Sequence, residues 1–233
     1  HIKDITYSGN IKYNSDKEFL SDGNIKTAIG SAEYDIIYDA DKILSGVISG
    51  DSVHIGKILN DKRLGTTSFN FDVVYNTIST QTIPSAKALG KIHHIAYNGY
   101  NYNKISIDAQ SYPTGMKGMV DIDDENLKSC ANITYIDAPH KDIQLDLSLD
   151  KIHFNNLNLV KTDKEEELSL KAIAQLRGKD FKHLYGNIEF NDINLQTKEN
   201  NYSLKDIIIN AQKQENETSL YTINSEILTA SIE

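Results

Sequence analysis

The chain has 233 residues and a formal net charge of −9, with acidic and basic residues interspersed along its length. Binding to nucleic acid or to an anionic bilayer needs concentrated Lys and Arg that neutralise phosphates, so we expect no nucleic-acid partner. The single cysteine, Cys130, excludes an internal disulfide framework, and we expect it to be a small buried residue of a strand.

Alternation of apolar and polar residues dominates the chain and predicts an all-β fold. There are only 3 proline residues and many Ile, Tyr, Thr and Asn residues, which favours long strands. Turn signals recur about every ten residues, a spacing typical of a long antiparallel meander of about 16 strands. We therefore expect residues 1–233 to form a single repeating segment, with a weak subdivision near residues 79–86.

One segment breaks the alternation. Ile55, Ile58 and Leu59 have helical spacing, and Gly65 is expected to end the run. This predicts a short helix near residues 55–60 that plugs or caps the sheet. The strand predicted after it, residues 68–76, places Phe69, Phe71 and Val73 on one face.

Residues 90–110, GKIHHIAYNGYNYNKISIDAQ, predict a hairpin with its turn at residues 97–99. Ile105 and Ile107 begin a clean alternation in the second strand. Tyrosine side chains flank the turn, and a ring with a polar tip suits the rim of a sheet; these are Tyr97, Tyr100 and Tyr102.

The C-terminal half repeats the one-faced alternation. Residues 142–150, DIQLDLSLD, place four aliphatic side chains on one face and three aspartates on the other. Residues 167–176 and 204–212 follow the same pattern. The charged run at residues 161–167, KTDKEEE, is expected to be a solvated loop.

No motif predicts an enzyme, a cofactor or a metal site. Adjacent strand residues point to opposite faces, so His93 and His94 cannot both ligate one ion without a bulge. Residues 121–126, DIDDEN, lack the Gly and the terminal Glu of a calcium loop and predict a strand ending in an acidic turn. No phosphate-binding loop, nucleophile elbow or convergent polar cluster is present.

A meander with one apolar and one polar face must hide the apolar face, in a barrel, a sandwich or an open trough. About 16 strands at about 4.8 Å make a ribbon of about 80 Å. Few Pro and Gly corners and the absence of Trp disfavour a compact sandwich. An unfilled trough would admit an acyl chain, which gains about 25 cal/mol per Å² of apolar surface buried. We expect this groove to be lined by Ile105, Ile107, Val120, Ile122, Ile133, Leu145, Leu147, Leu170, Ala172, Ile188, Phe190, Ile207 and Ile209.

Residues 46–74, GVISGDSVHIGKILNDKRLGTTSFNFDVV, resemble segments of TamB and AsmA-like proteins, particularly those of Bacteroidetes. In that family a strand is followed by a short motif of the form lGkll-d-LG, and the motif is followed by another strand. Residues 89–110 and residues 115–135, GMKGMVDIDDENLKSCANITY, resemble the next units. The resemblance extends over roughly residues 24–233 and is one of repeat style, since its motifs are degenerate.

The resemblance implies a repeating, taco-shaped β-groove in the periplasm. The full-length parent of such a segment is anchored in the inner membrane and meets the outer membrane beside a TamA-type barrel protein. The family, known as the translocation and assembly module, is linked to phospholipid transfer and to outer-membrane biogenesis. It has no catalytic residues to carry over. This chain matches neither the anchor nor the C-terminal end of the family, so we expect an internal fragment.

Two other functions fit the same sequence. Exposed edge strands could pair with nascent outer-membrane strands, which would make the chain a scaffold or chaperone for β-barrel assembly and secretion. Alternatively, the apolar face could be the filled core of a structural or adhesive β-domain.

Overall fold

The computed structural model describes residues 4–14, 18–78, 83–137, 139–160, 166–181, 183–213 and 219–232. The chain divides into two compact units. The first unit comprises His1–Pro113 and Ile122–Asp124, and the second comprises Thr114–Asp121 and Glu125–Glu233. Residues 83–86, at the expected subdivision, lie within the first unit, and residues 79–82 fall outside the described residues.

The chain is all-β, as predicted: its described residues form fifteen strands and one short helix. The first unit contains β1 (Thr6–Tyr13), β2 (Phe19–Thr27), β3 (Gly30–Tyr38), β4 (Ile43–His54), α1 (Ile55–Leu59), β5 (Leu64–Asn76), β6 (Ala86–Tyr97) and β7 (Tyr100–Tyr112). The second unit contains most of β8 (Gly115–Asp123), then β9 (Leu127–Asp137), β10 (Lys141–His153), β11 (Glu166–Gly178), β12 (Leu184–Thr197), β13 (Asn201–Lys213), β14 (Ser219–Ser225) and β15 (Thr229–Ile232).

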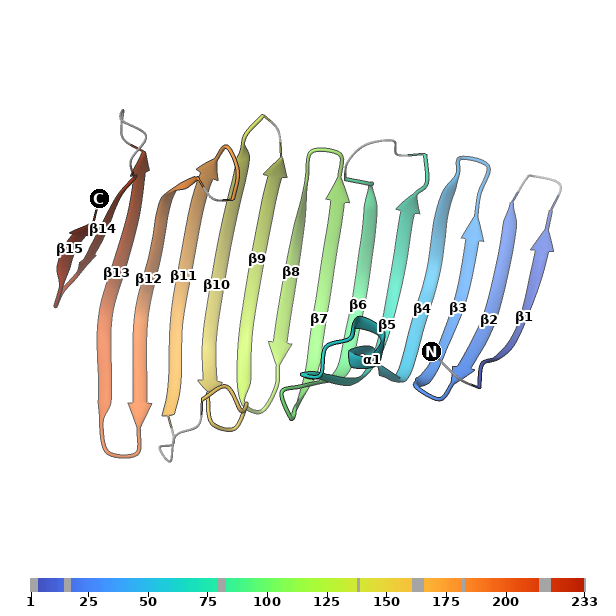
Figure 1. Cartoon of the computed structure of the whole chain (residues 1–233), viewed down its shortest axis with the longest axis horizontal. Helices are drawn as coiled ribbons and strands as arrows, with labels where there is room; N and C mark the ends of the chain where they lie inside the picture. Colours follow the sequence, from blue (N-terminus) through green and yellow to red (C-terminus); the bar gives the residue numbers. More distant parts are fainter. Residues whose placement is uncertain are drawn as a thin grey trace. The chain divides into compact units, whose positions relative to one another are not determined.

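Each unit is an antiparallel meander. In the first unit β1 to β7 lie in sequence order, and each strand is antiparallel to the next. In the second unit β8 to β15 also follow sequence order, and every pair from β9–β10 to β14–β15 is antiparallel. The order can be followed in Figure 1 by the colour change along the chain. The predicted meander is therefore confirmed within each unit.

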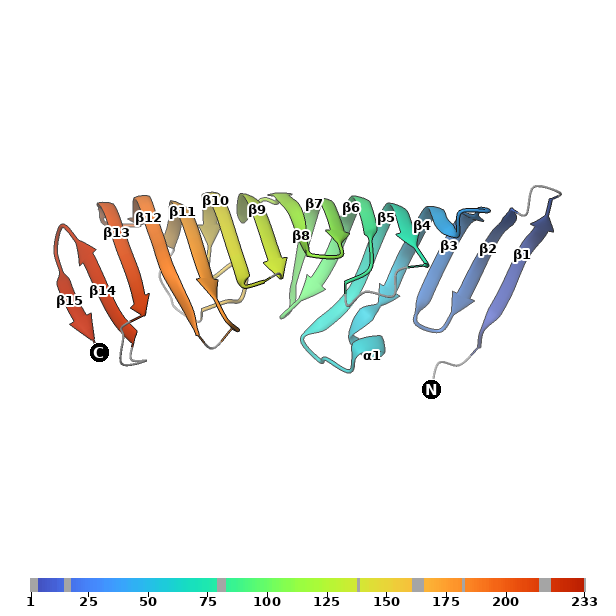
Figure 2. The same ribbon diagram turned by 90° about the horizontal axis from the view of Figure 1, so that it is seen from above.

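The sheet of each unit is a single layer. Across the described residues, elements make extensive contacts only with their sheet neighbours, except that α1 packs against β5. Figure 2 shows the strands of each unit edge-on without a second layer facing them. Buried hydrophobic side chains are correspondingly few among the described residues, namely Ile105, Leu157, Ala172 and Ala174. Neither unit has the filled interior of a two-layer sandwich in its described part.

The helix forms where it was predicted, but it ends earlier. α1 stops at Leu59 because Asn60 adopts a left-handed conformation (φ 56°) and donates its N–H to the carbonyl of Gly56. The prediction that Gly65 ends the helix is wrong, since Gly65 lies in β5. The predicted charged loop is also partly wrong: Glu166 and Glu167 begin β11, and residues 161–165 lie outside the described residues.

The predicted hairpin is confirmed. β6 and β7 are joined by Asn98 and Gly99, both with positive φ (50° and 81°), which is the two-residue turn that matches strand twist. Tyr100 packs edge-to-face on Tyr102, with ring centroids 4.9 Å apart. Desolvation, together with Tyr97 and Asp124, raises the pKa of Tyr102.

The acidic stretch at residues 121–126 is a strand end followed by a turn, as predicted: residues 121–123 end β8, and residues 124–126 connect it to β9. Asp124 in this turn is only 4% exposed, and its side chain bonds to the β6–β7 hairpin of the first unit. The carboxylate of Asp124 accepts hydrogen bonds from the Tyr100 hydroxyl, from the Asn103 backbone N–H (2.9 Å) and from the Asn103 side-chain amide (3.2 Å). The cluster ties the end of β8 to the hairpin.

We predict that Asp124→Ala destabilises the chain by about 2–3 kcal/mol, because it leaves buried donors without their acceptor. Urea denaturation measures this change. Asp123→Ala is the matched control: its carboxylate is exposed and lies 4.0 Å from an exposed Lys104, so its loss should cost under about 1 kcal/mol. Equal effects of the two variants would contradict a structural role for Asp124.

Candidate functional site

Cross-strand pairing in the second unit gathers most of the predicted lining residues on one face. Directly paired residues of an antiparallel sheet point to the same side. One row across β10 to β13 is Leu147, Ala172, Phe190 and Ile207, and the neighbouring row across β9 to β14 is Ile133, Leu145, Ala174, Ile188, Ile209 and Ile223. Leu170 joins them by pairing with Leu149. We call these residues the apolar face of the second unit.

The exposure of this face varies along the rows. Ala172 and Ala174 are buried beneath larger neighbours, whereas Leu145 and Leu147 are half-buried and Ile133 is 43% exposed. Because no described element of the second unit packs over the rows, the remaining exposure is open to solvent or to a ligand.

The opposite face of the second unit is polar. Asp142, Gln144 and Asp146 alternate with the leucines of β10. Arg177 Nη2 lies 2.7 Å from Asp142 Oδ2, and the hydrogen bonds that the guanidinium donates to this carboxylate raise the pKa of Arg177. Cys130 also lies on this side, paired with Ser148, and is half-buried rather than fully buried as expected.

In the first unit the predicted residues Ile105 and Ile107 lie on a comparable face. Ile105 pairs with Ile92 of β6, and Ile107 pairs with Gly90. Their rows continue across the sheet through Phe69 and Phe71 of β5. We define the apolar face of the first unit by two rows from β3 to β7: Ala32, Gly50, Phe69, Ile92 and Ile105; and Tyr34, Ile48, Phe71, Gly90 and Ile107.

Val120 and Ile122 are the remaining predicted residues, and both lie on β8. They are half-buried and two positions apart, so they share one side of their strand. Val120 belongs to the second unit and Ile122 to the first.

Sequence reasoning missed the glycine–aromatic pairs of the first unit as part of the lining. Side-chain rings lie against glycines on paired strands, so that a methyl group on Gly23 would meet the ring of Tyr34 at 2.9 Å, and one on Gly50 would meet the ring of Phe69 at 2.5 Å. The glycines let the rings lie across the sheet. The alternation of Phe69 and Phe71 was visible in the sequence, but their glycine partners depend on strand register.

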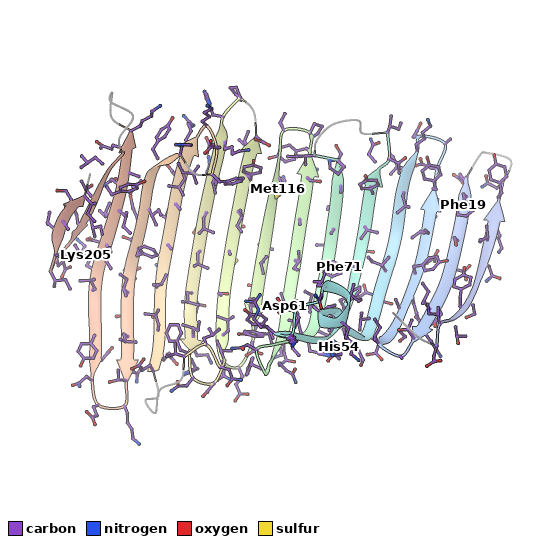
Figure 3. The ribbon with its side chains drawn as sticks, viewed as in Figure 1. Phe19, His54, Asp61, Phe71, Met116 and Lys205 are labelled. Atoms are coloured by element: carbon purple, nitrogen blue, oxygen red, sulfur yellow. The ribbon has the colours of Figure 1, made fainter. Side chains whose placement is uncertain are left out.

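The two units share one local feature: a long strand has a register shift near its end and then finishes at a histidine. The β4–β5 register shifts between Gly50 and Val53, and the β10–β11 register shifts between Leu149 and Ile152. Each of these strands then ends in a histidine. His54 is followed by α1 (Figure 3), and His153 is followed by turns at residues 154–160, where Leu157 donates its N–H to the His153 carbonyl.

The two histidines differ in their partners. His153 Nε2 lies 3.1 Å from a Glu167 carboxylate oxygen, whereas His54 Nδ1 is buried without a hydrogen-bond partner. His93 and His94, the adjacent pair, lie where the β5–β6 register shifts: Ser68 pairs with His94, but Phe69 pairs with Ile92. The bulge that the sequence would need for a shared ion is therefore present. Within the described ranges, however, no group of three His, Cys, Asp or Glu side chains is arranged to hold a metal.

The segment after α1 is held by a tight ion pair. Arg63 Nη2 lies 2.7 Å from Asp61 Oδ2, and the Arg63 guanidinium lies 5.8 Å from the ring centroid of Tyr97. Hydrogen bonds from the Arg63 side chain and backbone lower the pKa of Asp61 to about 2. Asp61 lies beside α1 in Figure 3.

We predict that the Asp61–Arg63 contact persists in mild acid. The folded-state pKa is depressed below the ordinary value of 3.8, so the contribution of this carboxylate is present above pH 3.8 and is lost as the pH falls through about 2. NMR titration of the Asp61 carboxyl group should give a midpoint near 2 in the wild type and a midpoint near the ordinary value in Arg63→Gln. A wild-type midpoint near 3.8 would contradict the pairing.

At the edge of the apolar face of the second unit, the Lys141 ammonium group lies among aromatic rings. Lys141 Nζ lies 2.6 Å from Asp137 Oδ1 and donates to the Tyr135 hydroxyl at 2.9 Å. It also lies 5.1 Å from the centroid of Phe181, which stacks on Tyr135. The hydrogen bond to Asp137 is the main reason that the pKa of Lys141 is raised.

A polar depression of about 690 Å³ on the first unit is a poor candidate for chemistry. Two of its three carboxylates accept hydrogen bonds from asparagine amides: Asn10 donates to Asp22 (3.0 Å) and Asn24 donates to Glu33 (2.6 Å). These hydrogen bonds are cross-strand links on an exposed face, and the arrangement has no nucleophile paired with a base.

No described helix has the length and hydropathy needed to cross a bilayer. No protein-family model, curated protein or solved structure matches this chain.

Proposed function

We propose that the two apolar faces hold the acyl chains of phospholipids, as a groove segment of a TamB/AsmA-like bridge protein. The observation that carries the proposal is the single-layered sheet, since α1 is the only described element of either unit that departs from it. An apolar face left in water is unfavourable, and a ligand that covers it gains hydrophobic free energy.

The chemistry of the faces favours a flexible apolar ligand. The second unit offers aliphatic rows with two buried alanines between leucine and phenylalanine or isoleucine. Each methylene that a ligand buries contributes about 0.8 kcal/mol, so about ten methylenes contribute about 8 kcal/mol before the ligand loses conformational freedom. A polar ligand would find few hydrogen-bond partners along these rows.

The cellular setting is part of the same proposal. We place the segment in the periplasm, in a parent protein tethered to the inner membrane that meets a TamA-type barrel protein at the outer membrane. Support comes from the resemblance of residues 46–74 and from the strand, bulge, histidine and turn that recur in both units. A groove built from successive structural repeats is expected to show the same local feature in each repeat.

Mass spectrometry of the purified chain tests the proposal. We expect phospholipid to co-purify in near-stoichiometric amount and to rebind from phospholipid vesicles after delipidation. The absence of bound lipid together with a failure to rebind would contradict it.

Assembly scaffolding is the second candidate, and the exposed edge of β1 favours it. All residues of β1 are exposed in the described structure, so the strand could template another strand. Crosslinks from β1 to an unfolded outer-membrane barrel protein, with no lipid bound, would favour scaffolding over lipid carriage.

A further inference from the structure

An ion pair among aromatic rings lies at one end of the apolar face of the second unit. Its four residues are Tyr135, Asp137, Lys141 and Phe181, and we call them the Lys141 cluster. Lys141 Nζ donates to Asp137 Oδ1 at 2.6 Å and to the Tyr135 hydroxyl at 2.9 Å. The hydrogen bond from Lys141 is the main reason that the pKa of Asp137 is lowered. Both members of the ion pair are therefore charged at neutral pH.

Strand pairing places the Lys141 cluster on the same side of the sheet as the apolar rows. Tyr135 pairs with Ile143, and Lys141 stands two residues before Ile143 on β10. Phe181 follows β11 and stacks on Tyr135, with ring centroids 5.8 Å apart. The end of β9, the start of β10 and the end of β11 lie side by side here (Figure 1). A ligand that lies along β10 on the apolar face would therefore have one end beside Lys141.

The apolar part of β10 has about the length of one acyl chain. Ile143, Leu145, Leu147 and Leu149 share one side of the strand and extend over about 20 Å, at about 3.4 Å per residue. Each leaflet of a bilayer has about 15 Å of hydrocarbon thickness. An acyl chain parallel to β10 can therefore lie on these four side chains while its headgroup stands beside Lys141.

The Lys141 cluster complements a headgroup that carries both charges. The Lys141 ammonium has three N–H groups, and its two oxygen acceptors among the described residues leave one N–H for a phosphate oxygen. The Asp137 side chain is 34% exposed, so its carboxylate can accept a hydrogen bond from a primary ammonium group. The Phe181 ring is 63% exposed and can also contact a cation. A headgroup with only negative charge would meet the Asp137 carboxylate without a cation of its own.

We propose that the Lys141 cluster holds the headgroup of a zwitterionic phospholipid, one with a phosphate and a primary ammonium group, whose acyl chain lies parallel to β10. Lys141 donates to the phosphate, and Asp137 accepts from the ammonium group. The inference rests on the proposed function, because it names the lipid class and the direction of the lipid on the same apolar face.

Rebinding of mixed lipids to the delipidated chain tests the headgroup class. Vesicles contain equal amounts of phosphatidylethanolamine and phosphatidylglycerol with identical acyl chains, and mass spectrometry gives the ratio that is bound. The wild type should bind phosphatidylethanolamine in about fivefold excess, and Asp137→Asn should remove this preference. Equal binding of the two lipids by the wild type would overturn the headgroup inference and leave the proposed function standing. Binding of neither lipid would overturn both.

Two lysine variants at opposite ends of β10 test the role of Lys141. Lys141→Gln should weaken phosphatidylethanolamine binding by about fivefold or more, because the phosphate loses its charged donor. Lys151→Gln is the matched control: Lys151 pairs with Lys128 at the far end of the strand, so lipid binding should remain at the wild-type level. Circular dichroism checks that both variants keep their strands. Equal losses in the two variants, or none in Lys141→Gln, would overturn the assignment of the phosphate to Lys141.

A photoreactive lipid tests the direction in the wild-type chain, with no substitution that could disturb folding. Phosphatidylethanolamine with a diazirine at the end of one acyl chain should label peptides that contain Leu149. The same lipid with the diazirine in its headgroup should label peptides that contain Tyr135 or Phe181. The reverse pattern, or equal labelling by the two probes, would overturn the proposed direction.

Discussion

Leu147→Asp is expected to reduce phospholipid binding by more than tenfold. The side chain stands between Ala131 and Ala172 in a row of the apolar face of the second unit. The substitution removes about 1.5–3 kcal/mol of apolar contact and adds a carboxylate that a bound acyl chain would desolvate, and about 1.4 kcal/mol already corresponds to tenfold. Fluorescent-lipid displacement or lipid mass spectrometry measures the change.

Ser148→Asp is the matched control for this variant. It introduces the same charge one residue along β10, on the polar face, where Ser148 pairs with Cys130 and Lys171. Lipid binding should remain at the wild-type level. An equal loss of lipid binding in the two variants would mean that a negative charge on either face of β10 disturbs folding or repels the ligand. That result would contradict a specific role for the apolar face.

Gly90→Ala is expected to destabilise the first unit by about 2 kcal/mol or more, as substitutions that force a backbone shift do. Its methyl group would meet the backbone carbonyl oxygen of Asn70 and the ring and Cα of Phe71, so the β5–β6 pairing would have to move. Chemical denaturation followed by circular dichroism measures the loss.

Gly23→Ala separates backbone crowding from the general effect of replacing a strand glycine. There the three atoms nearest to the new methyl group all belong to the Tyr34 side chain, at 2.9 Å, and a side chain can move aside more easily than backbone. The cost should stay under about 1 kcal/mol, since ordinary strand positions favour alanine over glycine. A larger loss in Gly23→Ala than in Gly90→Ala would contradict the assigned register of β5 and β6.

The faces of the strands could be predicted from alternation, because the side-chain period of a strand is two. Leu145, Leu147, Ile188 and Ile209 were assigned to one face from sequence and lie together across four paired strands. The faces were easier to predict in the second unit, because apolar and polar residues alternate along its strands without interruption. Whether this face binds lipid stays a prediction.

Features that depend on register could not be read from one strand at a time. The bulge at His93 exists because β5 and β6 pair unequally on its two sides, and neither strand alone indicates it. The contacts of Gly50 and Gly90 with phenylalanine rings likewise follow from cross-strand pairing. The end of α1 was misplaced because Asn60, which can adopt a left-handed conformation, ended the helix before Gly65.

The apolar faces of the two units differ in composition. The first unit offers phenylalanine and tyrosine rings laid against glycines, and the second offers aliphatic rows around Ala172 and Ala174. Rings laid flat make a broad, even surface, whereas small residues between large ones make shallow recesses. If both faces bind lipid, variants of Phe71 and Leu147 should lower binding independently, because they lie in different units.

Site-specific photo-crosslinking at Leu147 and Ser148 tests the central claim most directly. A photoreactive amino acid at Leu147 should crosslink to phospholipid when the chain is incubated with phospholipid vesicles. The same group at Ser148, on the polar face of the same strand, should give little or no lipid adduct. Lipid adducts of equal yield at the two positions, or adducts at Ser148 alone, would contradict the claim that the apolar face is where acyl chains bind.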